Sequence, residues 1–147
     1  MRVFIENEQG SNKKNLFNEK TLEYKRTVEV SRAYPYPYGF LIGTTSGDGD
    51  NVDCFILTHQ ELKTGTIVEA EPVGMFEQIE DGQEDHKILA VLPGEMVEID
   101  AEMQAIFREF IAYVFDHKPG KQITVGRFLG KNEAEKLITK TQDKPFI

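Results

Sequence analysis

Short apolar segments recur along the first two thirds of the chain, separated by polar and turn-forming residues. Segments of this length, rich in β-branched or aromatic residues or alternating with polar positions, are typical of β-strands. We therefore expect strands at residues 3–5, 27–30, 40–42, 52–58 and 88–92. Residues 66–80 form a longer extended candidate, in which Pro72 and Gly74 predict a bend or bulge. Several short strands with turn residues between them indicate a small β-barrel.

Helical periodicity begins only after residue 100. Asp100 can cap a helix whose apolar residues recur at three- and four-residue spacing, namely Met103, Phe107, Phe110, Ile111 and Val114. Pro119-Gly120 predicts the end of this helix. We expect a short strand at 122–125 and then a terminal helix capped by Asn132, with Glu135 completing a capping box. The order predicts one domain over residues 1–147 in the α+β class, a β-barrel with helices packed outside.

Composition narrows the class of protein. The 147 residues carry a formal net charge of −8 and have a pI near 4.9, which disfavours nucleic acid and anionic membranes as partners. No apolar run reaches the ~20 residues of a membrane span, and the first residues lack the apolar core of a secretion signal. The single Cys54 cannot form an internal disulfide, so we expect a cytoplasmic protein. The three histidines show no zinc-type spacing.

Carboxylates gather in two places along the chain. Asp48, Asp50 and Asp53 fall within six positions, where they would repel one another unless a cation lay among them. The second group spans residues 80–85 and leads to Lys87. Grouped carboxylates suit hard divalent cations such as Mg²⁺ or Mn²⁺. Each group can also be a solvated turn, and that alternative stays open at this point.

The spacing within these groups adds two details. An EF-hand is excluded, because its sixth position would be Asp53 instead of Gly and its twelfth His59 instead of Glu. Asp53 also lies inside an apolar stretch, where an uncompensated carboxylate is costly. If the second segment is extended, Asp85 and Lys87 point to one side. A carboxylate and an ammonium facing one cavity could hold a metal ion and a phosphate together.

These motifs together resemble a known family. Tyr34-Pro35 followed by Tyr38-Gly39, then Asp48-Gly49-Asp50 with Asp53, and later Glu84-Asp85 with Lys87, resemble soluble family I inorganic pyrophosphatases. The resemblance implies an OB-like five-stranded β-barrel with a long helix and a C-terminal helix outside. It also implies Mg²⁺-dependent hydrolysis of pyrophosphate to two orthophosphates by a cytoplasmic homo-oligomer, often a hexamer. Phe128, Leu129, Phe146 and Ile147 are candidates for contacts between subunits.

The resemblance also assigns roles to particular residues. Metal ions would be held by Asp48, Asp53, Asp85 and Glu80, with Asp53 bridging, and Asp50 would be the catalytic general base. Glu6 and Asp81 would form an outer acidic shell. The two phosphates would be bound by Lys13, Arg26, Tyr38, Lys87 and Lys118.

The chain departs from the family pattern at several of these positions. The usual Lys-Tyr-Glu reads Lys13-Lys14-Asn15, and Asn51 replaces a proline. The acidic pair is inverted to Glu80-Asp81, and the residue directly before Lys118 is not the tyrosine usual in the family. Two functions therefore stay open. One is a working pyrophosphatase. The other is a catalytically weak or inactive relative that binds a metal–phosphate ligand or a protein partner.

Overall fold

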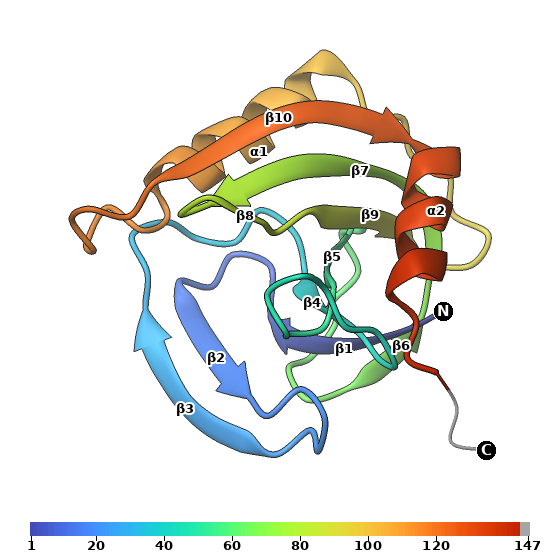
Figure 1. The fold of residues 1–147 in the computed structure, drawn as a ribbon, viewed down its shortest axis with the longest axis horizontal. Helices are drawn as coiled ribbons and strands as arrows, with labels where there is room; N and C mark the ends of the chain where they lie inside the picture. The colour runs from blue at the N-terminus through green and yellow to red at the C-terminus, as the bar shows by residue number, and fades with distance from the viewer. Residues whose placement is uncertain (145–147) are drawn as a thin grey trace.

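The computed structural model describes residues 1–144, which form a large sheet, a separate hairpin and two helices (Figure 1). The eight strands of the sheet are β1 (Arg2–Asn7), β4 (Tyr38–Leu41), β5 (Asp53–Ile56), β6 (Ile67–Glu69), β7 (Glu71–Glu80), β8 (Gln83–Glu84), β9 (Lys87–Val91) and β10 (Ile123–Gly130). The hairpin pairs β2 (Lys13–Phe17) with β3 (Tyr24–Glu29). The helices are α1 (Ala101–Tyr113) and α2 (Lys131–Thr141). No helix within residues 1–144 has the length and apolar character needed to cross a membrane.

The strands of the large sheet follow the order β10-β7-β9-β5-β4-β1-β6, with β8 paired to β7. β5 and β9 run parallel, and the other pairs are antiparallel. The α+β class predicted from the sequence is confirmed. Within residues 1–144 no pairing joins β6 to β10, so the closed five-stranded barrel is not confirmed.

Most predicted strands exist, with different bounds. The expected bend within residues 66–80 is confirmed, because β6 ends before Ala70 and the pairing of β7 with β9 shifts between Pro72 and Gly74. β10 is longer than the predicted strand at 122–125. β2 was not predicted, because its sequence Lys13–Phe17 is mostly polar and lacks a clear alternation of apolar residues.

The predicted start of α1 is confirmed, whereas its end and the start of α2 differ from expectation. The Asp100 side chain accepts a hydrogen bond from the Met103 amide at 2.9 Å, so the predicted cap of α1 is confirmed. However, α1 ends at Tyr113, and turns occupy the residues between it and Pro119. The predicted cap of α2 at Asn132 is wrong, because Gly130 is the N-cap and Asn132 lies inside the helix.

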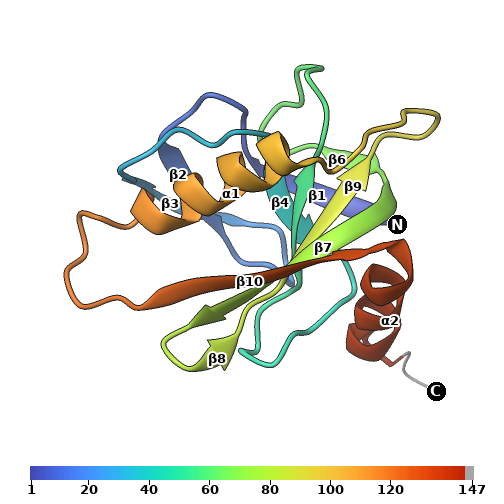
Figure 2. The same ribbon diagram turned by 90° about the horizontal axis from the view of Figure 1, so that it is seen from above.

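Side-chain alternation along the strands builds two cores on opposite faces of the sheet. Phe55 and Leu89 point toward the buried face of α1, whereas Cys54 and Ile88 belong to a second core that includes Ala134 of α2. Figure 2 shows α1 lying across one side of the sheet and α2 beside the end of β10. Because successive strand residues face opposite ways, β4, β5, β7, β9 and β10 contribute to both cores. Burial on both faces explains the near-continuous apolar sequences of β5 and β9.

Aromatic rings dominate the core beneath α1. Phe107 is fully buried, and its ring centroid lies 4.9 Å from that of Phe55 and 5.3 Å from that of Phe76. Phe128 packs against the same cluster, and Leu129 packs against the second core. Both side chains are therefore partly used within the subunit, and the other two proposed contact residues, Phe146 and Ile147, lie outside the described residues.

One glycine permits the close approach of β1 and β4. A Cβ atom at Gly39 would lie 1.7 Å from the Phe4 carbonyl oxygen. We predict that Gly39→Ala destabilises the protein by at least about 3 kcal/mol, the upper end of overpacking costs, because backbone atoms cannot turn aside. Gly47→Ala is the control, since a methyl group there meets nothing within 4 Å. Equal urea midpoints for the two variants would contradict the prediction.

Candidate active site

A cavity of about 250 Å³ opens where the core beneath α1 reaches the N-terminal ends of β5 and β9. We call it the acidic cavity, because seven carboxyl groups line it against three lysines. These charged residues are Glu6, Glu19, Asp48, Asp50, Asp53, Glu80, Asp85, Lys14, Lys87 and Lys121. The other lining residues are Gln78 and a mainly aromatic wall of Leu16, Tyr34, Tyr38, Phe55, Phe110, Ile111, Val114 and Phe115.

A buried ion cluster lies at the inner end of the cavity. The parallel register of β5 and β9 places Asp53 opposite Lys87. The Lys87 ammonium, in a residue only 4% exposed, donates hydrogen bonds to Asp53, to Asp85 at 3.0 Å and to the Tyr38 hydroxyl at 3.3 Å. The prediction that Asp85 and Lys87 point to one side is confirmed. Burial lowers the pKa of Lys87, but Asp53 and Asp85 outweigh burial and raise it above its ordinary value.

Several carboxyl groups in the cavity hold their protons more strongly than usual. Burial, with repulsion from Asp53 and Glu19, raises the pKa of Glu6 to about 9. Burial also raises the pKa of Asp85, despite the neighbouring Lys87, and that of Asp50, where Asp48 and Asp53 add to the effect. The common cause is removal from water near other carboxylates. The cavity therefore has less positive charge than its carboxylates require.

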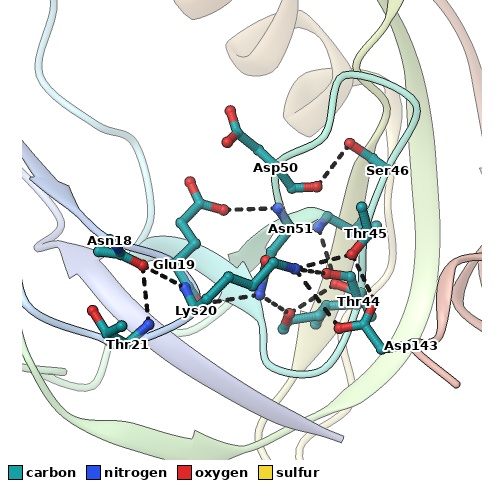
Figure 3. Close-up of polar contacts among 12 residues, drawn as sticks. Asn18, Glu19, Lys20, Thr21, Thr44, Thr45, Ser46, Asp50, Asn51 and Asp143 are labelled. Atoms are coloured by element: carbon teal, nitrogen blue, oxygen red, sulfur yellow. Dashed lines mark hydrogen bonds and ion pairs between the residues drawn. The ribbon is translucent and has the colours of Figure 1, made fainter. Parts of the chain in front are cut away.

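Asp48 and Asp50 lie on the loop of residues 42–52, which joins β4 to β5. The Asp48 side chain accepts hydrogen bonds from the Ser46 hydroxyl and from the Asp50 amide, the latter at 3.0 Å. Glu19, from the turn between β2 and β3, accepts a hydrogen bond from the Asn51 amide at 2.9 Å (Figure 3). These contacts bring a third segment of the chain to the cavity.

Comparison with known proteins identifies the family. The family model described as inorganic pyrophosphatase matches residues 3–144. The chain belongs to the inorganic pyrophosphatase family. The curated inorganic pyrophosphatase of Nanoarchaeum equitans is 33% identical over 151 residues, covering 96% of this chain and 94% of that protein. That of Saccharolobus solfataricus is 29% identical over 156 residues, with 98% and 91% covered.

Solved structures of inorganic pyrophosphatases share the fold. The protein from Neisseria gonorrhoeae superposes with a TM-score of 0.87 at 26% identity, covering 96% of this chain and 88% of that one. The protein from Helicobacter pylori gives a TM-score of 0.84 at 25% identity, with 96% and 90% covered. Membership of the inorganic pyrophosphatase family, first indicated by the motifs, is thereby confirmed.

The structure gathers most of the acidic residues that the resemblance to inorganic pyrophosphatases singled out. Six of them line the acidic cavity, namely Glu6, Asp48, Asp50, Asp53, Glu80 and Asp85. Asp81 lies instead in an adjoining hollow shared with Asp48, Glu80 and Asp85. It occupies a tight turn with a φ of 50°, and its side chain accepts a hydrogen bond from the Gln122 amide at 3.0 Å. Asp81 therefore ties two segments together at the edge of the site.

The predicted basic residues are placed less uniformly than the acidic ones. Lys87 and Tyr38 line the cavity, but Lys13 does not, because its side chain pairs with Glu29 on the other face of the hairpin. Lys118 lies beside a neighbouring hollow of residues 111–123. Arg26 is exposed opposite Leu16 in the register of β2 and β3, so it shares the face of the hairpin that meets the cavity.

Strand alternation corrects the interpretation of Lys13-Lys14-Asn15. Lys14 and Leu16 line the cavity, whereas Asn15 faces away and donates a hydrogen bond to the Glu6 carbonyl oxygen at 2.9 Å. Asn15 therefore does not stand where a cavity carboxylate would. Asn51, the other noted departure, is buried, and its side chain donates a hydrogen bond to the Leu41 carbonyl oxygen at 3.0 Å.

Four polar or charged residues of the cavity were not found from the sequence. Lys14 lies in β2, and side-chain alternation would have placed it in the cavity if that strand had been predicted. Lys121 forms an ion pair with Glu80 at 2.7 Å, and its ammonium and that of Lys14 lie 4.3 and 4.8 Å from the Phe115 ring centroid. No sequence motif marks Gln78 or Glu19 as a site residue. Gln78 is one residue of the long strand β7, and Glu19 lies in a polar turn that looks like an ordinary solvated one. Burial, with Asp53 and Asp50 nearby, raises the pKa of Glu19 to about 7.

The donor chemistry fits a divalent metal ion. Within residues 1–144 no three carboxylate, imidazole or thiol groups are already placed to hold one, and the Lys87 ammonium joins Asp53 to Asp85. However, the part of the chain that the structure describes lines the cavity with seven carboxyl groups and with no histidine or cysteine, which suits hard cations. Burial and repulsion from neighbouring carboxylates raise the pKa of Glu6 and of Asp50, and a bound cation would offset the repulsion.

The raised pKa of Glu6 predicts how stability depends on pH. Because the folded protein binds this proton more tightly than the unfolded chain, the associated stability is complete below about pH 4.5 and is lost as pH rises toward 9. In metal-free protein, Glu6→Gln should flatten the decline of unfolding free energy across this range by up to about 1.4 kcal/mol per pH unit, the limit for one proton.

Urea unfolding in EDTA at pH 5 to 9 measures this slope. Glu23→Gln is the matched control, because Glu23 is an exposed residue and the substitution removes the same charge. Parallel profiles for Glu6→Gln and Glu23→Gln would show that Glu6 does not titrate in the folded state as predicted.

Proposed function

We propose that this protein hydrolyses inorganic pyrophosphate to two orthophosphates in a reaction that requires Mg²⁺. The observation that carries the proposal is the convergence of Asp48, Asp50, Asp53 and Asp85 on one cavity with lysine side chains, in a member of the inorganic pyrophosphatase family. Carboxylates to hold metal ions and ammonium groups to bind phosphate are the two components that such a hydrolysis needs.

Metal binding in this proposal falls to Asp48, Asp53, Asp85 and Glu80, with Mn²⁺ as the alternative ion. A divalent cation held there would supply a water of lowered pKa and offset the negative charge of the substrate. Occupation of the cavity by such an ion would require Lys87 to share Asp53 and Asp85, which it now bridges. Asp81 adds negative charge around these ligands, and Glu6 would add it once a bound cation lowered its raised pKa.

Asp50 is the general base in this proposal. It accepts a proton from the attacking water, whose oxygen forms a bond to one phosphorus atom while the bridging P–O bond breaks. Its pKa is raised by burial and by Asp48 and Asp53, which makes its carboxylate a stronger base than a solvated aspartate. The Ser46 hydroxyl donates to the Asp50 carbonyl oxygen at 3.1 Å, which fixes its backbone.

Phosphate binding is assigned to the basic residues that meet the cavity. Lys87 and Tyr38 lie at its inner end, and Lys14 and Lys121 flank Phe115 on its wall. Lys14 replaces Lys13 in this role, since Lys13 pairs with Glu29. Arg26 and Lys118 would reach the substrate from the rim. Flexible ammonium groups suit a substrate with several phosphate oxygens.

We further propose that the protein acts in the cytoplasm as a closed homo-oligomer, with a hexamer as the expected form, and that its sheet corresponds to an OB-like barrel. Family membership supports these assignments. A homo-oligomer of this kind would be built from repeated copies of one surface arranged by closed symmetry.

Phosphate release from pyrophosphate tests the proposed activity. We expect release with Mg²⁺ or Mn²⁺ and none above blank in EDTA. No release with either metal between pH 6 and 9, together with a pyrophosphate-dependent rise in melting temperature, would instead support the non-catalytic relative. The ion cluster of Lys87 with Asp53 and Asp85 is the observation that favours this second function, because it already neutralises part of the metal-binding surface.

Two substitutions separate the roles of the loop carboxylates. Asp50→Asn should lower turnover by about two to four orders of magnitude, as for loss of a general base, while leaving Mg²⁺ affinity nearly unchanged. Asp53→Asn should weaken Mg²⁺ binding, because one of the carboxylates that would hold the metal is lost. Calorimetric Mg²⁺ titration and steady-state kinetics measure both effects, with the exposed Asp116→Asn as control. Equal Mg²⁺ affinities for the Asp50 and Asp53 variants would refute this division.

A further inference from the structure

The loop that carries Asp48 and Asp50 is held in part by contacts with other segments of the chain. It contains Gly43, Gly47 and Gly49, and the first and last of these have φ values of 79° and 89°. Glycine gives a loop more conformations than other residues do, so an unrestrained loop of this sequence would place its carboxylates poorly. Hydrogen bonds within the loop, such as that from the Ser46 amide to the Asp50 carbonyl oxygen at 2.7 Å, shape it. The side chains of Thr44 and Asn51 hold its two ends to β4, since both donate to the Leu41 carbonyl oxygen, at 2.8 and 3.0 Å.

The segment at the end of α2 supplies one external attachment. The Thr45 amide donates a hydrogen bond to the Thr141 carbonyl oxygen at 2.8 Å, and the Asp143 amide donates to the Gly43 carbonyl oxygen at 2.9 Å. The Thr45 hydroxyl also donates to the Asp143 carboxylate at 2.6 Å. These contacts hold the first part of the loop to the segment that ends α2 and follows it.

Lys20 supplies the second attachment, from the turn between β2 and β3. Its ammonium donates hydrogen bonds to the Thr44 carbonyl oxygen at 3.0 Å and to the Thr45 hydroxyl at 2.9 Å, and lies 3.7 Å from the Asp143 carboxylate (Figure 3). One side chain therefore joins three segments that are distant in sequence: the hairpin turn, the loop and the end of the chain.

The turn that presents Lys20 is itself well fixed. The Asn18 side chain accepts hydrogen bonds from the Lys20 and Thr21 amides, both at 3.0 Å. Leu22 has a φ of 65°, a strained value for a residue with a side chain, which persists only where the surroundings enforce it. Glu19 of the same turn binds the Asn51 amide at the other end of the loop. The turn thus contacts the loop on both sides of Asp48 and Asp50.

We propose that Lys20 is a positioning residue, which anchors the loop of residues 42–52 so that Asp48 and Asp50 face the acidic cavity. This inference rests on the proposed function for its effect on catalysis, but the anchoring itself is independent of it. Lys20 is outside the acidic cavity and touches neither substrate nor metal in the proposed reaction. Its charge also lowers the pKa of Asp50, so the exchange of the loop amides, which reports on anchoring, is measured beside kcat.

The test compares Lys20→Met, Lys20→Arg and, as a charge-matched control, Lys63→Met on an exposed loop. Lys20→Met should lower kcat by about ten- to a hundredfold, since small misplacements of reacting groups have effects of this size, and raise the Mg²⁺ concentration for half-maximal rate. Hydrogen exchange of the metal-free protein should quicken at residues 43–51 and stay unchanged in β9. Lys20→Arg keeps the positive charge and the hydrogen-bond donors, so its kcat, Mg²⁺ requirement and loop exchange should all be close to those of the unaltered protein.

Two outcomes would overturn the proposal. Loop exchange in Lys20→Met equal to that in Lys63→Met would show that Lys20 does not anchor the loop. Faster exchange throughout the sheet, with a matching fall in melting temperature, would show a general structural role. If the unaltered protein releases no phosphate, the proposed function fails separately. The exchange measurement and a calorimetric Mg²⁺ titration of the same variants then decide the anchoring role alone.

Discussion

The buried ammonium of Lys87 is the constraint on which the site depends. Burying an isolated charge is very unfavourable, so Lys87 can lie in the interior only with carboxylates against it. The parallel pairing of β5 with β9 provides Asp53, and the residue two places before Lys87 provides Asp85. A shift of one residue between these strands would separate the charges and also reverse which side chains enter each core. The ion cluster and the two cores therefore specify the same register.

Around this fixed centre, the remaining functional groups come from segments attached by polar contacts. The hairpin contributes Lys14 and Glu19, the loop of residues 42–52 contributes Asp48 and Asp50, and the segment after α1 contributes Lys121. Such attachments are weaker than core packing, and exposed ion pairs in particular add little to stability. These polar attachments matter for the geometry of the site, because they hold the carboxylates at fixed positions around the rigid core.

Most acidic residues that the motifs singled out line the acidic cavity, whereas Lys87 is the one predicted lysine that does. Asp48, Asp50 and Asp53 are close in sequence, and the side chains of Asp85 and Lys87 follow from simple alternation, so local rules suffice for them. Whether Lys13 or Lys14 meets the cavity depends on the pairing of β2 with β3 and on the side of the hairpin that faces the sheet. Neither is visible in a polar segment such as Lys13–Phe17. The cap at Asn132 failed for a related reason, because the end of β10 allows α2 to begin directly after Gly130.

The imbalance of charge in the acidic cavity links folding to the proposed chemistry. Carboxyl groups outnumber lysines there, and burial raises the pKa of Glu6 to about 9 and that of Glu19 to about 7. A structure selected only for stability would have fewer buried carboxylates or more cations, because unpaired buried charges are destabilising. A divalent ion that binds the folded chain would relieve this repulsion and stabilise the fold by mass action. The same carboxylates that weaken the metal-free protein thus give it affinity for the cation that the reaction requires.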